Sequence, residues 1–154
     1  MNNEERVSPM GMWRWGKDFI ESALKIHPPP KNDIEELRQR VSITAYYLLA
    51  HGIELQMKAF LLSKGYQLKD LRSYKKFGHN LDALMDEAIG SMIGDCVALS
   101  EYERGIISLL NRTYKEKELE YFLSGYKSLP NYSELCNLAN KISNGLSGYI
   151  RKTV

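Results

Sequence analysis

The chain has 154 residues, of which 44% are hydrophobic and 26% are charged, and its formal net charge is +2. This length suits one domain, 1–154, and we expect residues 1–9 to be flexible. Because the net charge is low, composition alone does not indicate nucleic-acid or membrane binding. A local patch of positive charge would be needed. No apolar run approaches the roughly 20 residues of a membrane span. The two cysteines, Cys96 and Cys136, show no CxxC spacing, which fits a cytoplasmic protein without a disulfide framework.

Apolar residues recur every three or four positions along most of the chain, which predicts helices and not strands. The expected helices are Met10–Ile26, Asp33–Gly65, Asn80–Ile89, one from Ser100 through Lys115 to Phe122, and one from Asn131 through Tyr149. The longest, Asp33–Gly65, is apolar on most sides over its second half, so the other helices should surround it. We therefore predict an all-α fold, an antiparallel bundle of about five helices around one long central helix.

Local signals set the expected helix boundaries. Three consecutive prolines, residues 28–30, separate the first two helices, and Asn32 or Asp33 can cap the second. Gly65 ends the long helix, and Ser100 with Glu103 forms a capping-box pattern. The inward faces are expected to include Ile26, Ile34, Leu37, Val41, Ile89 and Tyr102.

The first group of candidate site residues is a polar stripe on the long helix. Tyr47, His51, Glu54 and Lys58 follow one another at steps of four, three and four, so they share one face. Glu54 and Lys58 form an i,i+4 pair in the favoured order. The stripe is either a paired polar seam that sets the register of neighbouring helices or the lining of a site.

The second group lies in the connection from Tyr66 to Gly78. It holds the cations Lys69, Arg72, Lys75 and Lys76 around the aromatic residues Tyr74 and Phe77. Such a segment can hold a phosphate by charge and a base by stacking. His79, at the start of the next helix, is a candidate acid or base near neutral pH. The alternative is a solvated lysine-rich loop whose histidine helps to cap a helix.

The third group is Arg112 and Tyr114, which are expected to point in different directions, one outward and one to the core. Most of the charged stretch around them is expected to be an exposed helical face. The sequence has no GxGxxG, Walker A, HExxH or GxSxG motif. Its three histidines lack metal-ligand spacing, so neither a metal nor a cofactor is expected.

Three segments in order resemble the HEPN superfamily of small helical bundles. They are residues 50–65, with Glu54-x-x-x-Lys58-Ala59 and a closing Gly65; Gly78-His79-Asn80-Leu81; and Leu110 to Tyr114, followed by Glu120-Tyr121. The resemblance implies a bundle of four or five helices that is often a homodimer. It also implies either a metal-independent ribonuclease of toxin–antitoxin and defence systems or a non-catalytic module that binds RNA, a nucleotide or a cognate protein partner.

The family's ribonuclease motif is an arginine, four to six residues, and then a histidine, and Arg72 and His79 satisfy this spacing. In catalytic members the motif usually lies on a late helix, whereas the late helix here has Arg112 without a following histidine. We therefore expect a non-catalytic module, with a ribonuclease that uses Arg72 and His79 as the alternative. Some of Trp13, Trp15, Tyr46 and Tyr47 are expected at a subunit interface.

Overall fold

The computed structural model describes residues 7–119 and 128–152. Within these ranges there is no strand, and the five longest helices are α1 (Pro9–Ile26), α3 (Ile43–Ser63), α5 (Leu81–Gly90), α6 (Glu101–Tyr114) and α7 (Tyr132–Lys152). Two short helices, α2 (Asp33–Arg38) and α4 (Leu68–Leu71), and a 3₁₀ turn (Ile93–Asp95) lie in the connections. The predicted all-α bundle is confirmed.

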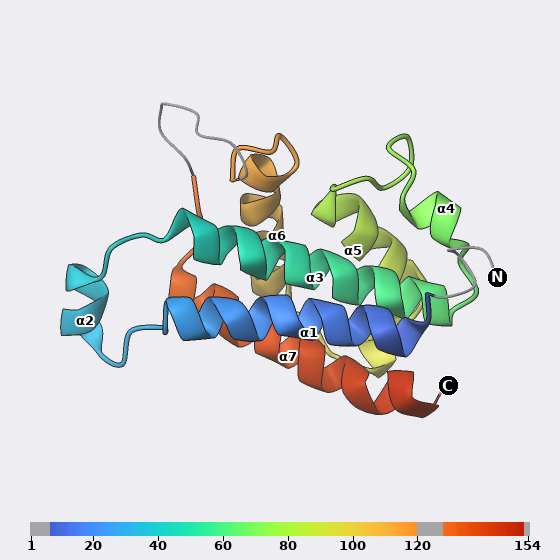
Figure 1. The fold of residues 1–154 in the computed structure, drawn as a ribbon, viewed down its shortest axis with the longest axis horizontal. Coiled ribbons are helices and arrows are strands. Elements are labelled where there is room, and N and C mark those ends of the chain that lie inside the picture. The colour runs from blue at the N-terminus through green and yellow to red at the C-terminus, as the bar shows by residue number, and fades with distance from the viewer. Residues whose placement is uncertain (1–6, 120–127, 153–154) are drawn as a thin grey trace.

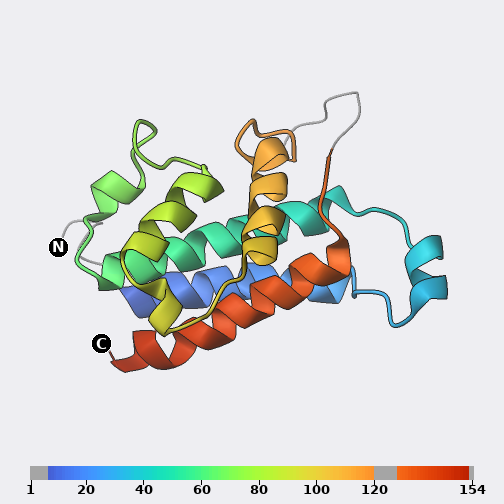
Figure 2. The same ribbon diagram turned by 180° about the vertical axis from the view of Figure 1, so that it is seen from behind.

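Helix α3 is the centre of the bundle. Helices α1 and α7 run alongside it, with α1 antiparallel to both of the others, and α5 and α6 pack across it (Figures 1 and 2). Its side chains are buried on nearly all sides from Ala45 to Leu61, and Ile53, Met57 and Phe60 are fully buried. A helix that is apolar all round needs such a surrounding, because each large apolar side chain gains about 1.5–3 kcal/mol when it leaves water.

Two glycines let α1 and α3 approach closely. A Cβ built on Gly52 would lie 2.7 Å from Cγ1 of Ile20 and 2.8 Å from the carbonyl oxygen of Gly16. A Cβ on Gly16 would meet the carbonyl oxygen of Gly52 at 2.8 Å in the same way. The two helix backbones therefore pack against each other with no room for a side chain at either position.

The predicted single helix Asp33–Gly65 is wrong in its first third. Asn32 caps α2 as expected, but Gln39 is extended, with φ −70° and ψ 134°, and Ser42 caps a separate helix, α3, through the amide of Ala45. Figures 1 and 2 show α2 standing away from the bundle at one end. The end of α3 is as predicted, since Lys64 is its C-cap and Gly65 follows with φ +98°.

Several side chains expected on inward faces are exposed. Ile34, Leu37 and Val41 are 63%, 88% and 68% exposed, because no other element within residues 7–119 and 128–152 covers these side chains. Ile26, Ile89 and Tyr102 are also exposed. Helix α6 begins at the predicted capping box but ends at Tyr114. Lys117 has a positive φ of 59°, which helical continuation does not allow. Phe122, the predicted end, lies outside the described residues.

Among the described residues, no helix combines the length and the apolarity that crossing a bilayer requires.

Replacing Gly52 by alanine should destabilise the protein. The new methyl group would meet Ile20 and the Gly16 carbonyl at about the distances given above, so the helices must separate, at a cost of about 1–3 kcal/mol. Denaturant unfolding measures this change. Gly148→Ala is the matched control: it lies on α7 with no atom within 4 Å of the new Cβ, so it should stabilise by about 0.5–1 kcal/mol. Equal effects of both substitutions would contradict the close approach of α1 and α3.

Candidate functional site

The candidate site is built on the carboxylate of Glu54, in the middle of α3. This residue is only 1% exposed, and Lys58, one turn further along the helix, is also buried. The ammonium of Lys58 lies 3.3 Å from Oε2 of Glu54 and donates a hydrogen bond to the carbonyl oxygen of Gly78 at 3.0 Å. Burial of both charges is tolerated because each has its counter-ion within the same helix.

The other carboxylate oxygen of Glu54 accepts two hydrogen bonds, one from the connection before α5 and one from the end of α6. Nδ1 of His79 lies 2.7 Å from Oε1, and the hydroxyl of Tyr114 donates to the same atom at 2.8 Å. Nδ1 of His51 lies 3.0 Å from the Tyr114 hydroxyl. Because the carboxylate and the phenol oxygen are the acceptors, both imidazoles carry their proton on Nδ1 when neutral. We call His51, Glu54, Lys58, His79 and Tyr114 the carboxylate network.

Asparagines hold the start of α5 in place beside this network. Asn80 caps α5 by accepting from the amide of Ala83. Asn111 of α6, 2% exposed, accepts from the amide of Leu81 at 2.8 Å and donates to Oδ1 of Asn80 at 3.0 Å. This fixes the residue before the cap, His79, against α3. Sequence analysis missed Asn111 as a positioning residue. Its signal was a polar side chain on the apolar face that also carries Ile107 and Tyr114.

The structure therefore joins members of all three groups that the sequence left separate. The stripe on α3 is a paired, largely buried seam, and it is also in contact with His79 and Tyr114. His79 does not cap α5, since Asn80 does. The side chain of His79 is 32% exposed, so the network opens toward solvent there. Tyr114 is buried and Arg112 exposed, as predicted.

Aromatic rings form the walls of the network on the α1 side. The ring of Phe19 meets the imidazole of His51 edge to face at 4.6 Å. Tyr47, the remaining residue of the predicted stripe, stacks on His51 with 5.7 Å between ring centroids. These contacts hold the His51 ring in one orientation, with Nδ1 directed at the Tyr114 hydroxyl.

The basic connection, from Tyr66 to Gly78, leads directly into His79. Lys69, Lys75 and Lys76 are exposed, and Lys76 pairs with Asp70 at 3.3 Å. Tyr74 is 75% exposed and packs its backbone against Gly78, the residue before His79. The ammonium of Lys117, from the turn after α6, lies 5.8 Å from the centre of the Tyr74 ring. An exposed aromatic ring with one cation beside it therefore lies close to Gly78, the residue before His79.

Arg72 is not part of the carboxylate network and instead lines a cavity. It is the C-cap of α4 and lines a space of about 160 Å³ beside the start of α1, together with Val7, Ser8, Gly11, Met12 and Trp15. His79 is not part of that lining. Their separation in sequence satisfies a spacing, but the fold directs the two side chains to different surroundings.

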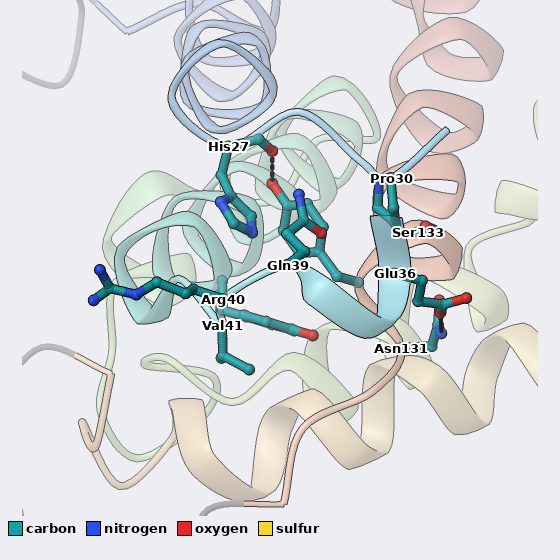
Figure 3. A pocket seen from close by; sticks show the side chains of 10 residues that line it. His27, Pro30, Glu36, Gln39, Arg40, Val41, Asn131 and Ser133 are labelled. Carbon is teal, nitrogen blue, oxygen red and sulfur yellow. Dashed lines mark hydrogen bonds between the residues drawn. The ribbon is translucent and has the colours of Figure 1, made fainter. Parts of the chain in front are cut away.

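A second cavity, of about 200 Å³, lies between the arm that carries α2 and the start of α7 (Figure 3). His27 forms one wall, and its carbonyl oxygen accepts from the hydroxyl of Tyr132 at 2.6 Å. Close by on α7, burial raises the pKa of the Cys136 thiol to about 11. A thiol that stays protonated at neutral pH is a poor nucleophile, so this cavity holds no activated cysteine.

Fold and site together define an all-α bundle with a buried carboxylate network. The network reaches solvent at His79, which directly follows the basic connection. No family model, curated protein or solved structure matches the chain. The resemblance to the HEPN superfamily therefore rests on the three sequence segments that carry it.

Replacing Glu54 alone should lower the free energy of unfolding much more than replacing both members of the ion pair. Glu54→Leu leaves the buried ammonium of Lys58 without its counter-ion, which costs about 3–5 kcal/mol. In Glu54→Leu/Lys58→Met both charges are replaced by apolar groups of similar volume, so most of this loss should be recovered. Denaturant unfolding of the three proteins gives the comparison. A double variant as unstable as the single one would show that the other partners of Glu54, and not Lys58, dominate its contribution.

Proposed function

We propose that this protein is a non-catalytic, HEPN-like helical module that binds RNA or a nucleotide. The observation that carries the proposal is the placement of Tyr74. Its ring is exposed and faces the Lys117 ammonium, and its backbone packs beside the opening where His79 reaches solvent. A base that stacks on this ring would place its phosphates among the lysines of the basic connection.

The carboxylate network supports a binding role in a second way. A buried ion pair adds little stability compared with apolar side chains of the same size, so the stability of the core does not by itself account for one. The network fixes the His79 ring while leaving its outer edge accessible. A fixed ring binds a ligand with less loss of side-chain freedom than a mobile one.

We also place this module in the cytoplasm as a homodimer. Both cysteines are free, which suits a reducing compartment. Trp13 and Tyr46 are buried within one chain, but Trp15 is 55% exposed and supports an interface on the face of α1 that also borders Arg72. Sedimentation of the purified protein measures its mass directly, and a monomer would rule the dimer out.

Tyr74→Ala should weaken RNA binding about 5–150-fold, because base stacking on an aromatic side chain contributes about 1–3 kcal/mol. The measurement is fluorescence anisotropy with a labelled single-stranded RNA of mixed sequence. Tyr102→Ala is the matched control, since Tyr102 is a similarly exposed tyrosine on α6 that bonds Glu134. Equal affinities of the wild type and Tyr74→Ala, or an equal loss in both variants, would contradict the proposal.

A metal-independent ribonuclease is the second candidate, and one distance favours it. The 2.7 Å contact between Oε1 of Glu54 and Nδ1 of His79 leaves Nε2 as the basic nitrogen. Placed near a ribose 2′-hydroxyl, this nitrogen would act as general base. Within one chain Arg72 lines another cavity, so its suggested role in stabilising the phosphorane would require the arginine of a second copy.

The ribonuclease candidate predicts cleavage of mixed structured and single-stranded RNA in EDTA. His79→Ala should abolish this cleavage, because general acid–base catalysis contributes about 10²–10⁴-fold. Arg72→Ala tests whether that arginine takes part. His27→Ala is the matched control, because His27 lines the cavity beside α2. No cleavage by the wild type, or equal cleavage by His79→Ala, would exclude this candidate and leave RNA binding to be judged by Tyr74→Ala.

A further inference from the structure

His51, Glu54 and His79 have the composition and the geometry of a metal-ligand set. One ligand atom from each residue lies within 4.8 Å of those from the other two. His51 and Glu54 are three residues apart on α3, so they project from adjacent turns of one face, and His79 reaches in from the start of α5. The set lies in the interior of the bundle, unlike a chance group of surface carboxylates.

The separations match what a small ion needs. Bonds of about 2.0–2.2 Å to zinc put neighbouring ligand atoms of a tetrahedral site about 3.3–3.6 Å apart. Nδ1 of His79 is 2.7 Å from Oε1 of Glu54, and Nδ1 of His51 is 3.8 Å from Oε2. All three ligand atoms lie within 4.8 Å of one another, so modest side-chain movements would bring the three residues to a common centre.

The surroundings supply the outer contacts that metal ligands require. The Tyr114 hydroxyl lies 2.8 Å from Oε1 of Glu54 and 3.0 Å from Nδ1 of His51, which is close enough to a common centre to orient a bound water or to act as a further ligand. Lys58 is anchored to the carbonyl of Gly78 and contacts Oε2. Oε1, which accepts from His79 and Tyr114 without an ion, would turn to the ion once Nδ1 of His79 no longer carries its proton. The like charge of Lys58 weakens the site without blocking it.

We infer that His51, Glu54 and His79 bind one divalent transition-metal ion, of which zinc is the best fit. Two imidazoles and one carboxylate are the donor set of many three-residue zinc sites, with a fourth position open to water. The ion binds to the lone pair of Nδ1, so Nδ1 can no longer carry a proton. In each neutral imidazole the proton is then on Nε2. Nε2 of His79 then carries the proton.

This transfer changes what the exposed edge of His79 can do. Without the ion, Nε2 is an acceptor and a base. With the ion on Nδ1, Nε2–H is a donor, which suits a phosphate oxygen and cannot take a proton from a ribose hydroxyl. An ion in this position therefore favours anion binding over base catalysis.

Zinc titration of the full chain tests the inference, with any affinity tag removed and the protein stripped of metal beforehand. In competition with a chromogenic chelator, the wild type should bind one zinc ion per chain. His51→Ala and His79→Ala should each weaken binding at least about tenfold, as the loss of even outer-shell partners does. His27→Ala should bind as the wild type does, because His27 lies in a different cavity.

The chain has three histidines, so the wild type alone also provides a test. One equivalent of zinc should shift the imidazole NMR signals of two rings and leave the third, assigned as His27 from the His27→Ala spectrum. Failure of the wild type to bind stoichiometrically, or zinc shifts at His27, would overturn the inference. The probe is zinc alone, so this outcome is independent of whether the protein binds RNA.

Discussion

The centre of the bundle depends on keeping the buried charge of Glu54 satisfied. Its partners come from separate parts of the chain: Lys58 from the same helix, His79 from the connection before α5, and Tyr114 from the end of α6. Each element must be in its native position for the carboxylate to have its full set of hydrogen bonds. Because an unpaired buried charge costs several kcal/mol, this requirement selects one arrangement of α3, α5 and α6 over others with similar apolar contacts.

Helical periodicity predicted the bundle well and one part of it badly, for a single physical reason. From Ile43 to Ser63 the apolar residues are surrounded by other helices, and there the prediction holds. The same spacing continues back through Leu37 to Ile34, but both side chains are exposed, and no helix among the described residues covers them. A periodic pattern shows that a face can be buried, not that a partner exists. The break itself depends on the cap at Ser42, which competes with continuation of the helix.

The candidate site shows the same division between local and long-range information. Spacing along one helix is enough to put His51, Glu54 and Lys58 on a shared face. The contact of Glu54 with His79 joins residues 25 positions apart and depends on how α5 sits against α3, which Asn111 of α6 helps to set. Arg72 illustrates the converse, because its spacing to His79 fits a motif while the intervening residues turn it toward α1. In an irregular connection, distance in sequence does not fix direction in space.

The environment of one ring nitrogen, Nδ1 of His79, decides whether the other nitrogen of the ring is a base or a hydrogen-bond donor. Nδ1 of His79 faces the carboxylate network, and whatever it contacts there decides the protonation of Nε2 at the surface. A hydrogen bond to Glu54 leaves Nε2 a base, whereas a metal ion on Nδ1 leaves it a donor. Tyr74 lies close to Gly78, the residue before His79, and is the exposed ring on which the proposed nucleotide would stack. Under that proposal, the interior of the bundle determines whether the nucleotide meets a base or a hydrogen-bond donor.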